Sequence, residues 1–77
     1  MKDRNIVGAR ISQARKEATP PITQADLIAR LQVMGIMFDQ STLSKIENQQ
    51  RPVTDLELVA LAKALKVSTK WLLGEDG

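Results

Sequence analysis

The chain of 77 residues contains neither cysteine nor histidine. A disulfide framework and a thiolate or imidazole metal site are therefore excluded. Most catalytic arrangements built around a nucleophile are excluded as well, because they need a cysteine or a histidine. Aromatic side chains are almost missing as well, because Phe38 and Trp71 are the only two. Aliphatic side chains must do nearly all of the packing, and we expect no cofactor and no metal.

Long apolar runs are also missing. Lys63 and Lys66 interrupt the longest candidate, so no segment approaches the roughly 18 residues that cross a bilayer. Residues 1–5, Met-Lys-Asp-Arg-Asn, lack the apolar core of a signal peptide. We therefore expect a single domain over residues 1–77, located in the cytoplasm and without a membrane partner.

An excess of charge of one sign is absent too. The net charge is +2, from 11 basic and 9 acidic residues. Residues 1–51 hold eight of the basic and five of the acidic residues, whereas residues 52–77 hold three and four. A mildly basic front suits a protein with one nucleic-acid face, although charge alone does not decide the partner.

Helix start signals recur four times along the chain. In each, an apolar residue precedes a capping residue and a leucine follows four positions after it, which is the pattern of a hydrophobic staple. The four are Ile22-Thr23 with Leu27, Phe38-Asp39 with Leu43, Val53-Thr54 with Leu58, and Val67-Ser68 with Leu72. Stop signals are Pro20-Pro21, Gly35, Pro52 and Gly74. We predict an all-α fold with helices over 4–18, 23–33, 40–48, 55–65 and 69–73, since no segment alternates as a strand does.

The third predicted helix, residues 40–48, has an apolar and a polar side. At about 100° per residue Leu43 and Ile46 fall together and define the buried side. The polar side carries short donors and acceptors and one cation: Ser41, Ser44, Lys45 and Asn48, with Gln40 at its margin. Glutamine can pair with adenine, lysine with guanine and serine with either, so this side suits base edges in the major groove. An ordinary solvent-exposed helix is the alternative at this point.

Arg15 and Glu47 lie on the shoulders of the apolar sides of the first and third predicted helices. A lone carboxylate at such a position is costly to desolvate. An Arg15–Glu47 ion pair would satisfy both groups and tie the two helices together. Two unpaired surface charges are the alternative.

Three ordered segments resemble the Cro/CI-type helix-turn-helix family, also called the xenobiotic-response-element family of prokaryotic and phage regulators. They are Thr23-Gln24-Ala25-Asp26-Leu27, then Ser41-Thr42-Leu43-Ser44-Lys45-Ile46-Glu47-Asn48, and finally Leu58-Val59-Ala60-Leu61-Ala62-Lys63-Ala64-Leu65 with Trp71-Leu72-Leu73. The resemblance covers residues 8–74 and implies a five-helix, lambda-repressor-like DNA-binding domain. It also implies that the second and third helices form the helix-turn-helix and that the protein works as a homodimer.

The resemblance implies roles for individual residues. The family's base-reading positions match Gln40, Ser41, Ser44 and Lys45. Gln24 matches a glutamine that bonds a DNA phosphate and braces a recognition-helix side chain, and the loop from Asn48 to Arg51 matches one that grips backbone phosphate. Arg15 and Glu47 match an interhelical ion pair. Thr23 joins the phosphate-binding set, since a helix N-terminus offers free N–H groups to an anion.

Two features depart from the family pattern. Ile28 stands where a small residue is common, and the connection between the second and third helices is longer than the compact family turn. We expect residues 30–34 to extend the second helix, Gly35 to end it, and residues 36–38 to fill an apolar turn. We expect the core, rather than a ligand pocket, to receive Ile28, Leu31, Met34, Met37 and Phe38. No small-molecule effector is expected.

The leading hypothesis is a sequence-specific transcriptional regulator, acting as a repressor, that binds double-stranded DNA as a dimer on half-sites about one helical turn apart. Candidate interface pieces are residues 52–54 and the helix around Trp71, although burial of Trp71 in the core is favoured. The alternative is a protein-interaction module on the same fold, with an antitoxin-like role or a phage-factor partner, which the apolar turn residues Ile36 and Met37 would support. No enzyme is expected, because no set of carboxylates accompanies a nucleophile, a glycine-rich phosphate loop or metal-ligand spacing.

Overall fold

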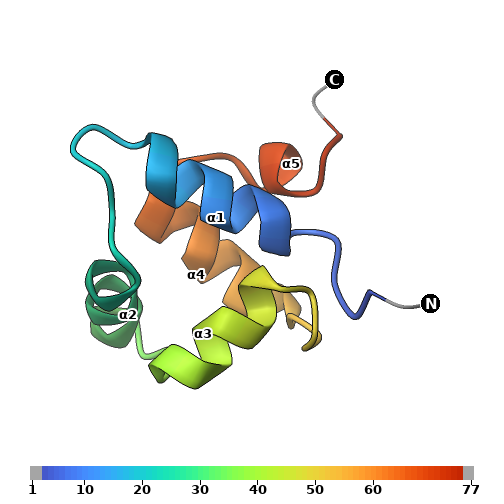
Figure 1. Cartoon of the computed structure of the whole chain (residues 1–77), viewed down its shortest axis with the longest axis horizontal. Coiled ribbons are helices and arrows are strands. Elements are labelled where there is room, and N and C mark those ends of the chain that lie inside the picture. Colours follow the sequence, from blue (N-terminus) through green and yellow to red (C-terminus); the bar gives the residue numbers. More distant parts are fainter. Residues whose placement is uncertain (1–2, 76–77) are drawn as a thin grey trace.

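Five helices and their connections make up residues 3–75, the part of the chain that the computed structural model describes. They are α1 (Gly8–Glu17), α2 (Gln24–Val33), α3 (Gln40–Glu47), α4 (Asp55–Leu65) and α5 (Thr69–Leu72). Within residues 3–75 there is no strand. Helix α4 contacts α1, α2 and α5, while α3 packs against α1 and α2 (Figure 1). The predicted all-α, five-helix fold is confirmed.

Four of the helices begin at the predicted capping residues. The side chains of Thr23, Asp39, Thr54 and Ser68 each accept a hydrogen bond from the backbone N–H three positions later. Asp26 and Glu57 complete capping boxes by accepting from the cap residue's own N–H. These bonds satisfy N–H groups that would otherwise lack partners at the helix starts. The signals are local, which is why the sequence located them.

The first helix begins later than predicted, at Gly8 rather than at residue 4. The buried side chain of Asn5 holds the segment before Gly8 in a non-helical conformation through four hydrogen bonds to the backbone. Its Oδ1 accepts from the N–H groups of Val7 and Gly8 at 3.1 and 2.8 Å. Its Nδ2 donates to the carbonyls of Ile46 and Arg51 at 3.1 and 2.7 Å. Asn5 therefore ties the start of α1 to the end of α3, and residues 3–7 follow the loop after α3 instead of forming a helical turn.

Gly8 lies where α1 crosses the end of α3. A Cβ added at Gly8 would collide with the carbonyl oxygen of Ile46 and come within 3.0 Å of that of Glu47. Both obstacles are backbone atoms, so neither can rotate away. We expect Gly8→Ala to lower the free energy of unfolding by about 1–3 kcal/mol, the usual cost of overpacking. Urea unfolding measures the change, with Gln13→Ala on the exposed side of α1 as the control; equal midpoints for the two variants would contradict the close approach.

The connection between α2 and α3 takes the predicted longer course. Gly35, at φ +84°, turns the chain after Met34. Leu31 and Phe38 are buried and Ile28 packs against the core. The expectation for Met34 and Met37 was wrong, because their side chains are 41% and 72% exposed. Side chains of an extended segment alternate in direction, so Phe38 facing inward places Met37 outward.

The core draws on every helix. Its fully buried side chains are Ile11 of α1, Leu27 and Leu31 of α2, Leu43 and Ile46 of α3, Leu61 of α4, and Leu72 of α5. Trp71 is only partly buried against this cluster, and the Arg10 guanidinium lies 4.9 Å from its ring centroid. Apart from Phe38, the interior is thus built from aliphatic side chains, and Leu43 and Ile46 anchor α3 to it.

Candidate nucleic-acid interface

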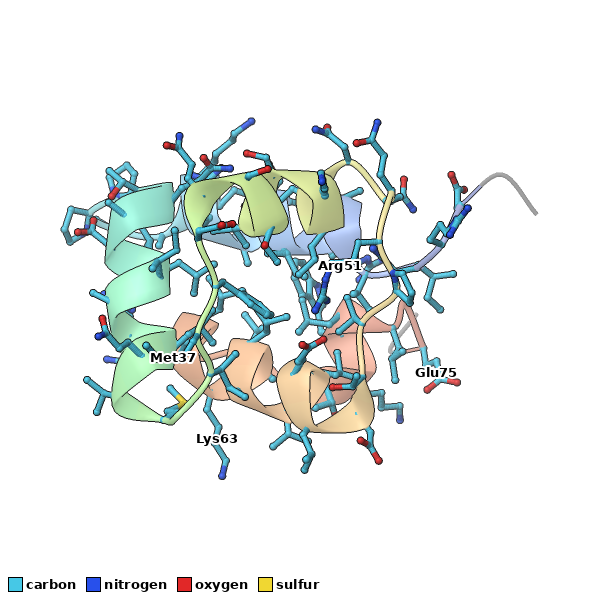
Figure 2. All side chains as sticks on the ribbon, turned by 90° about the horizontal axis from the view of Figure 1, so that it is seen from below. Met37, Arg51, Lys63 and Glu75 are labelled. Atoms are coloured by element: carbon cyan, nitrogen blue, oxygen red, sulfur yellow. The ribbon has the colours of Figure 1, made fainter. Side chains whose placement is uncertain are left out.

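Helix α3 shows the two sides that the sequence predicts. Leu43 and Ile46 are fully buried, and the opposite side leaves Gln40, Ser41, Lys45 and Asn48 exposed with Ser44 half-buried. Polar side chains stand along the edge of the molecule that α3 forms, which is the upper edge in Figure 2. The short helix therefore presents a hydrogen-bonding surface to solvent while its apolar side anchors it.

The predicted ion pair between Arg15 and Glu47 is confirmed. Arg15 Nε lies 2.8 Å from Glu47 Oε2, and Nη2 lies 3.0 Å from Oε1, so the contact is bidentate. Arg15 Nη1 also donates to the carbonyl of Ile22 at 3.2 Å. The two side chains are 12% and 9% exposed. One guanidinium thus joins α1, the segment before α2, and the last turn of α3.

Gln24 connects the first turn of α2 to the polar side of α3. Its Nε2 donates to Ser44 Oγ and to Glu47 Oε1, both at 3.3 Å. Its Oε1 accepts from Gln40 Nε2, also at 3.3 Å. Gln24 therefore holds two of the predicted base-reading side chains in relation to each other, and it does so from the end of α2 where the helix dipole favours an anion.

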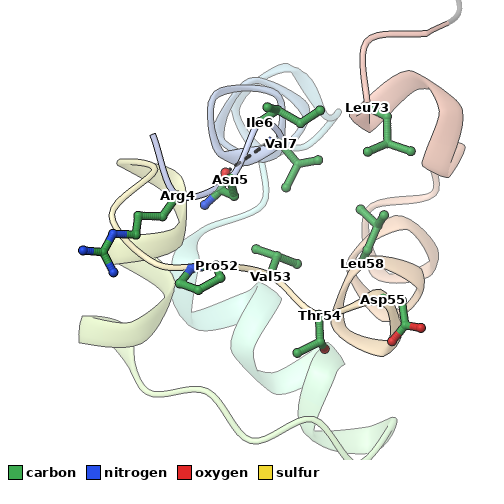
Figure 3. Close-up of a pocket in the computed structure, with 10 residues that line it drawn as sticks. All are labelled: Arg4, Asn5, Ile6, Val7, Pro52, Val53, Thr54, Asp55, Leu58 and Leu73. Carbon is green, nitrogen blue, oxygen red and sulfur yellow. Dashed lines mark hydrogen bonds between the residues drawn. The ribbon is translucent and has the colours of Figure 1, made fainter. Parts of the chain in front are cut away.

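The loop after α3 carries two further predicted phosphate contacts, Asn48 and Arg51, and it leaves Asn48 on an exposed turn. Gln49 adopts φ +63°, and its Nε2 donates to the carbonyl of Asn5 at 3.1 Å. The backbone N–H of Arg4 donates to the carbonyl of Gln49 at 2.9 Å. Arg4 is not among the site residues that the sequence predicts, because the pattern places it inside the first predicted helix. Its exposed side chain extends beside the loop (Figure 3) and adds a cation to this end of α3.

Arg51 is engaged within the fold. Its two terminal nitrogens each lie 3.0 Å from a carboxylate oxygen of Glu57, and Nη1 also donates to the carbonyl of Pro52 at 2.8 Å. Its guanidinium stacks 5.3 Å from the Phe38 ring centroid. Figure 2 shows Arg51 on the inner side of α3, away from the polar edge. A phosphate contact by Arg51 stays a prediction and requires the side chain to leave Glu57.

The Arg51–Glu57 pair makes stability depend on pH. The hydrogen bonds from Arg51 hold the pKa of the Glu57 carboxyl below its ordinary value of 4.5. Because the folded-state pKa is the lower one, this contribution is complete above about pH 4.5 and is lost as the pH falls through the folded-state value. We expect the urea midpoint of Glu57→Gln to fall less steeply than that of the parent protein below pH 4.5. Parallel curves would contradict this, and an Arg51→Met background should remove most of the difference.

Other kinds of site find little support in the described part of the chain. Among residues 3–75, no group of three or more acidic, histidine or cysteine side chains could hold a metal ion. In the same range no helix has the length and apolar character needed to cross a membrane.

Comparison with known families agrees with this geometry. A family model described as "Helix-turn-helix" matches residues 11–72, from the middle of α1 to the end of α5. The match includes α2, its connection and α3, the elements that build the polar surface. No curated protein and no solved structure gave a match. Since the family match spans most of its length, the chain belongs to the Cro/CI-type helix-turn-helix family of DNA-binding transcriptional regulators.

Proposed function

We propose that this protein binds a specific double-stranded DNA site through the major groove with residues 40–48 and represses transcription there. The observation that carries the proposal is the orientation of α3. Leu43 and Ile46 hold the helix from within, and its exposed side carries the groups that fit base edges. Gln40, Ser41, Ser44 and Lys45 are the proposed base-reading residues.

Backbone contacts at both ends of α3 would fix its register on the duplex. Phosphate contacts position a protein, whereas base contacts supply sequence information. At one end, Thr23 and Gln24 begin α2, where a helix N-terminus attracts phosphate. At the other end, Asn48 is exposed and Arg4 extends beside the loop after α3. Arg51 belongs to the proposed phosphate-binding residues only if its side chain leaves Glu57 when DNA binds.

The proposed active form is a homodimer. A groove beside the loop after α3 is lined mainly by aliphatic groups, among them Ile6, Val53, Leu58 and Leu73 (Figure 3). The side chain of Ile6 is exposed there, in a position where a partner would cover it. Half-sites about one helical turn apart require the two α3 helices to lie on the same side of the dimer, and a two-fold axis at this groove, which adjoins the loop after α3, is the arrangement that we propose. Of the interface pieces expected from the sequence, residues 52–54 line the groove and Trp71 does not.

An enzymatic role is not proposed. The carboxylates nearest the polar surface already have structural partners: Asp26 and Asp39 cap helices, Glu47 pairs with Arg15, and Glu57 pairs with Arg51. A protein-interaction module without DNA binding is the alternative, and exposed Met37 is the observation in its favour.

Selection of bound duplexes from a random library tests the proposal, because it requires no knowledge of the operator. The selected duplex is then titrated at several salt concentrations. A dimer that neutralises about six phosphates should lose affinity with a log–log slope of about −5. Enrichment of no sequence over the starting library, together with a flat salt dependence, would favour the protein-interaction alternative.

A further inference from the structure

Large apolar side chains are exposed where the end of α2 and the following turn lie against α4. Val33 and Leu56 are 89% and 74% exposed, and Met34 and Val59 are exposed as well. Two adjoining hollows contain these residues and share Met34 and Lys63. We call the surface formed by Val33, Met34, Ile36, Leu56 and Val59 the α2–α4 patch. Exposed apolar residues that adjoin one another and are rimmed by polar residues make this surface a candidate interaction site.

The charged residues that line the two hollows of the α2–α4 patch are all positive. Arg30, Lys63 and Lys66 line the two hollows, and no acidic residue does. Arg30 Nη1 donates to the carbonyl of Ala64 at 2.9 Å, which fixes this cation at the rim. Of the two acidic residues that flank Leu56 in the chain, Asp55 lines the groove of Figure 3 and Glu57 pairs with Arg51. A partner must therefore bring negative charge as well as apolar side chains.

The patch is separate from the surfaces proposed for DNA and for the second protomer. Lys63 points from the edge of the molecule opposite the polar side of α3 (Figure 2). None of the residues that line the two hollows lines the groove of Figure 3. A partner on the patch would thus leave both other surfaces accessible.

We propose that the α2–α4 patch binds an acidic amphipathic helix of another protein. Leu56, Val59 and Lys63 follow one another at helical spacing along α4, so they offer a ridge against which a second helix can lie with anchors at i, i+3 or i+4, and i+7. Carboxylates on the partner helix, next to its apolar anchors, would lie close to Lys63 and Lys66. This complementarity of charge would favour an acidic helix over a neutral or basic one. A second copy of this chain fits poorly, because a two-fold contact would place like patches, and hence like charges, against each other.

The proposal does not rest on DNA binding, so it is tested without DNA first. The probe is a phage-displayed library of random helical peptides of about four turns, selected on the parent protein and counter-selected on Leu56→Glu. Circular dichroism checks that Leu56→Glu still folds. We expect it to fold, because the Leu56 side chain is exposed and not part of the core. We expect enriched peptides to combine aliphatic anchors with aspartate and glutamate. A synthetic copy should bind Leu56→Glu at least about tenfold more weakly, a difference of about 1.4 kcal/mol.

Two further variants decide between explanations. Lys63→Glu should reverse the preference, so that a peptide with lysine in place of its acidic residues binds better than the original. Ile6→Glu, on the separate groove, should leave peptide binding unchanged, and so should Lys45→Ala on α3. Selection of no peptide, enrichment of neutral or basic peptides, or loss of binding in Lys45→Ala would overturn the proposal. A fall in molecular mass on Leu56→Glu but not on Ile6→Glu would overturn it too, since the patch would then join two copies.

Discussion

Replacing Arg15 with alanine should lower the free energy of unfolding by about 3–5 kcal/mol, the cost of leaving one member of a buried ion pair without its partner. The Glu47 side chain is only 9% exposed, so water cannot replace the lost guanidinium. Gln24 Nε2 would remain as a donor, but a neutral amide compensates a carboxylate poorly. In a domain whose stability is about 5–15 kcal/mol, this loss is large.

Urea unfolding followed by circular dichroism measures the effect. Lys16→Ala is the matched control, because it removes the adjacent and exposed cation of α1 and should change stability by no more than about 0.5 kcal/mol. Similar midpoints for Arg15→Ala and Lys16→Ala would show that the pair contributes nothing. The double variant Arg15→Met with Glu47→Met should recover most of the loss, since an apolar pair of similar volume needs no charge partner.

The double variant also separates stability from recognition. Without Glu47, Gln24 loses one of its two acceptors on α3 and keeps Ser44. The side chain of Gln40, which donates to Gln24, would then be held less firmly. A well-folded double variant with reduced discrimination between DNA sequences would indicate that the ion pair serves recognition through Gln24.

Replacing Lys45 with alanine should weaken binding to the selected DNA site by about 10- to 100-fold, since one good base contact provides about 1–3 kcal/mol of discrimination. Lys45 is exposed on the polar side of α3, and an ammonium group can donate to the acceptors of guanine. Binding to a scrambled duplex should change far less. Sequence preference would relax at the position that Lys45 contacts.

Fluorescence titrations of the selected and the scrambled duplex measure this difference. Arg4→Ala is the matched control, because it also removes one exposed cation but from the proposed phosphate-binding end of α3. It should weaken both duplexes alike and make the salt slope of the dimer shallower by about two, since each protomer loses one phosphate contact. Equal losses on both duplexes for Lys45→Ala would contradict its assignment to base reading.

Several features of the site could be read from the chain because their signals are local or periodic. The side chains of Thr23 and Asp39 accept hydrogen bonds from N–H groups only three residues away, so the local sequence is enough to predict these caps. The 3.6-residue period of a helix places Leu43 and Ile46 together and leaves the polar residues of α3 on the other side. The same period puts Arg15 and Glu47 beside apolar sides, where each needs a partner of opposite charge.

Other features depend on segments that only the folded chain brings together. The late start of α1 follows from a hydrogen bond between Asn5 and Ile46, which are 41 positions apart. Engagement of Arg51 by Glu57 depends on how the loop after α3 meets α4. The exposure of Met34 and Met37 depends on Phe38 taking the interior position.

Local hydrogen bonding and helical period thus decided that this chain forms five helices and that its third helix has a polar side. Tertiary packing decided which cations remain accessible at the ends of that helix and which apolar side chains stay outside the core. The physical reason is range: a cap or a helical face is complete within a few residues. Burial and ion pairing, in contrast, exist only after distant segments have met.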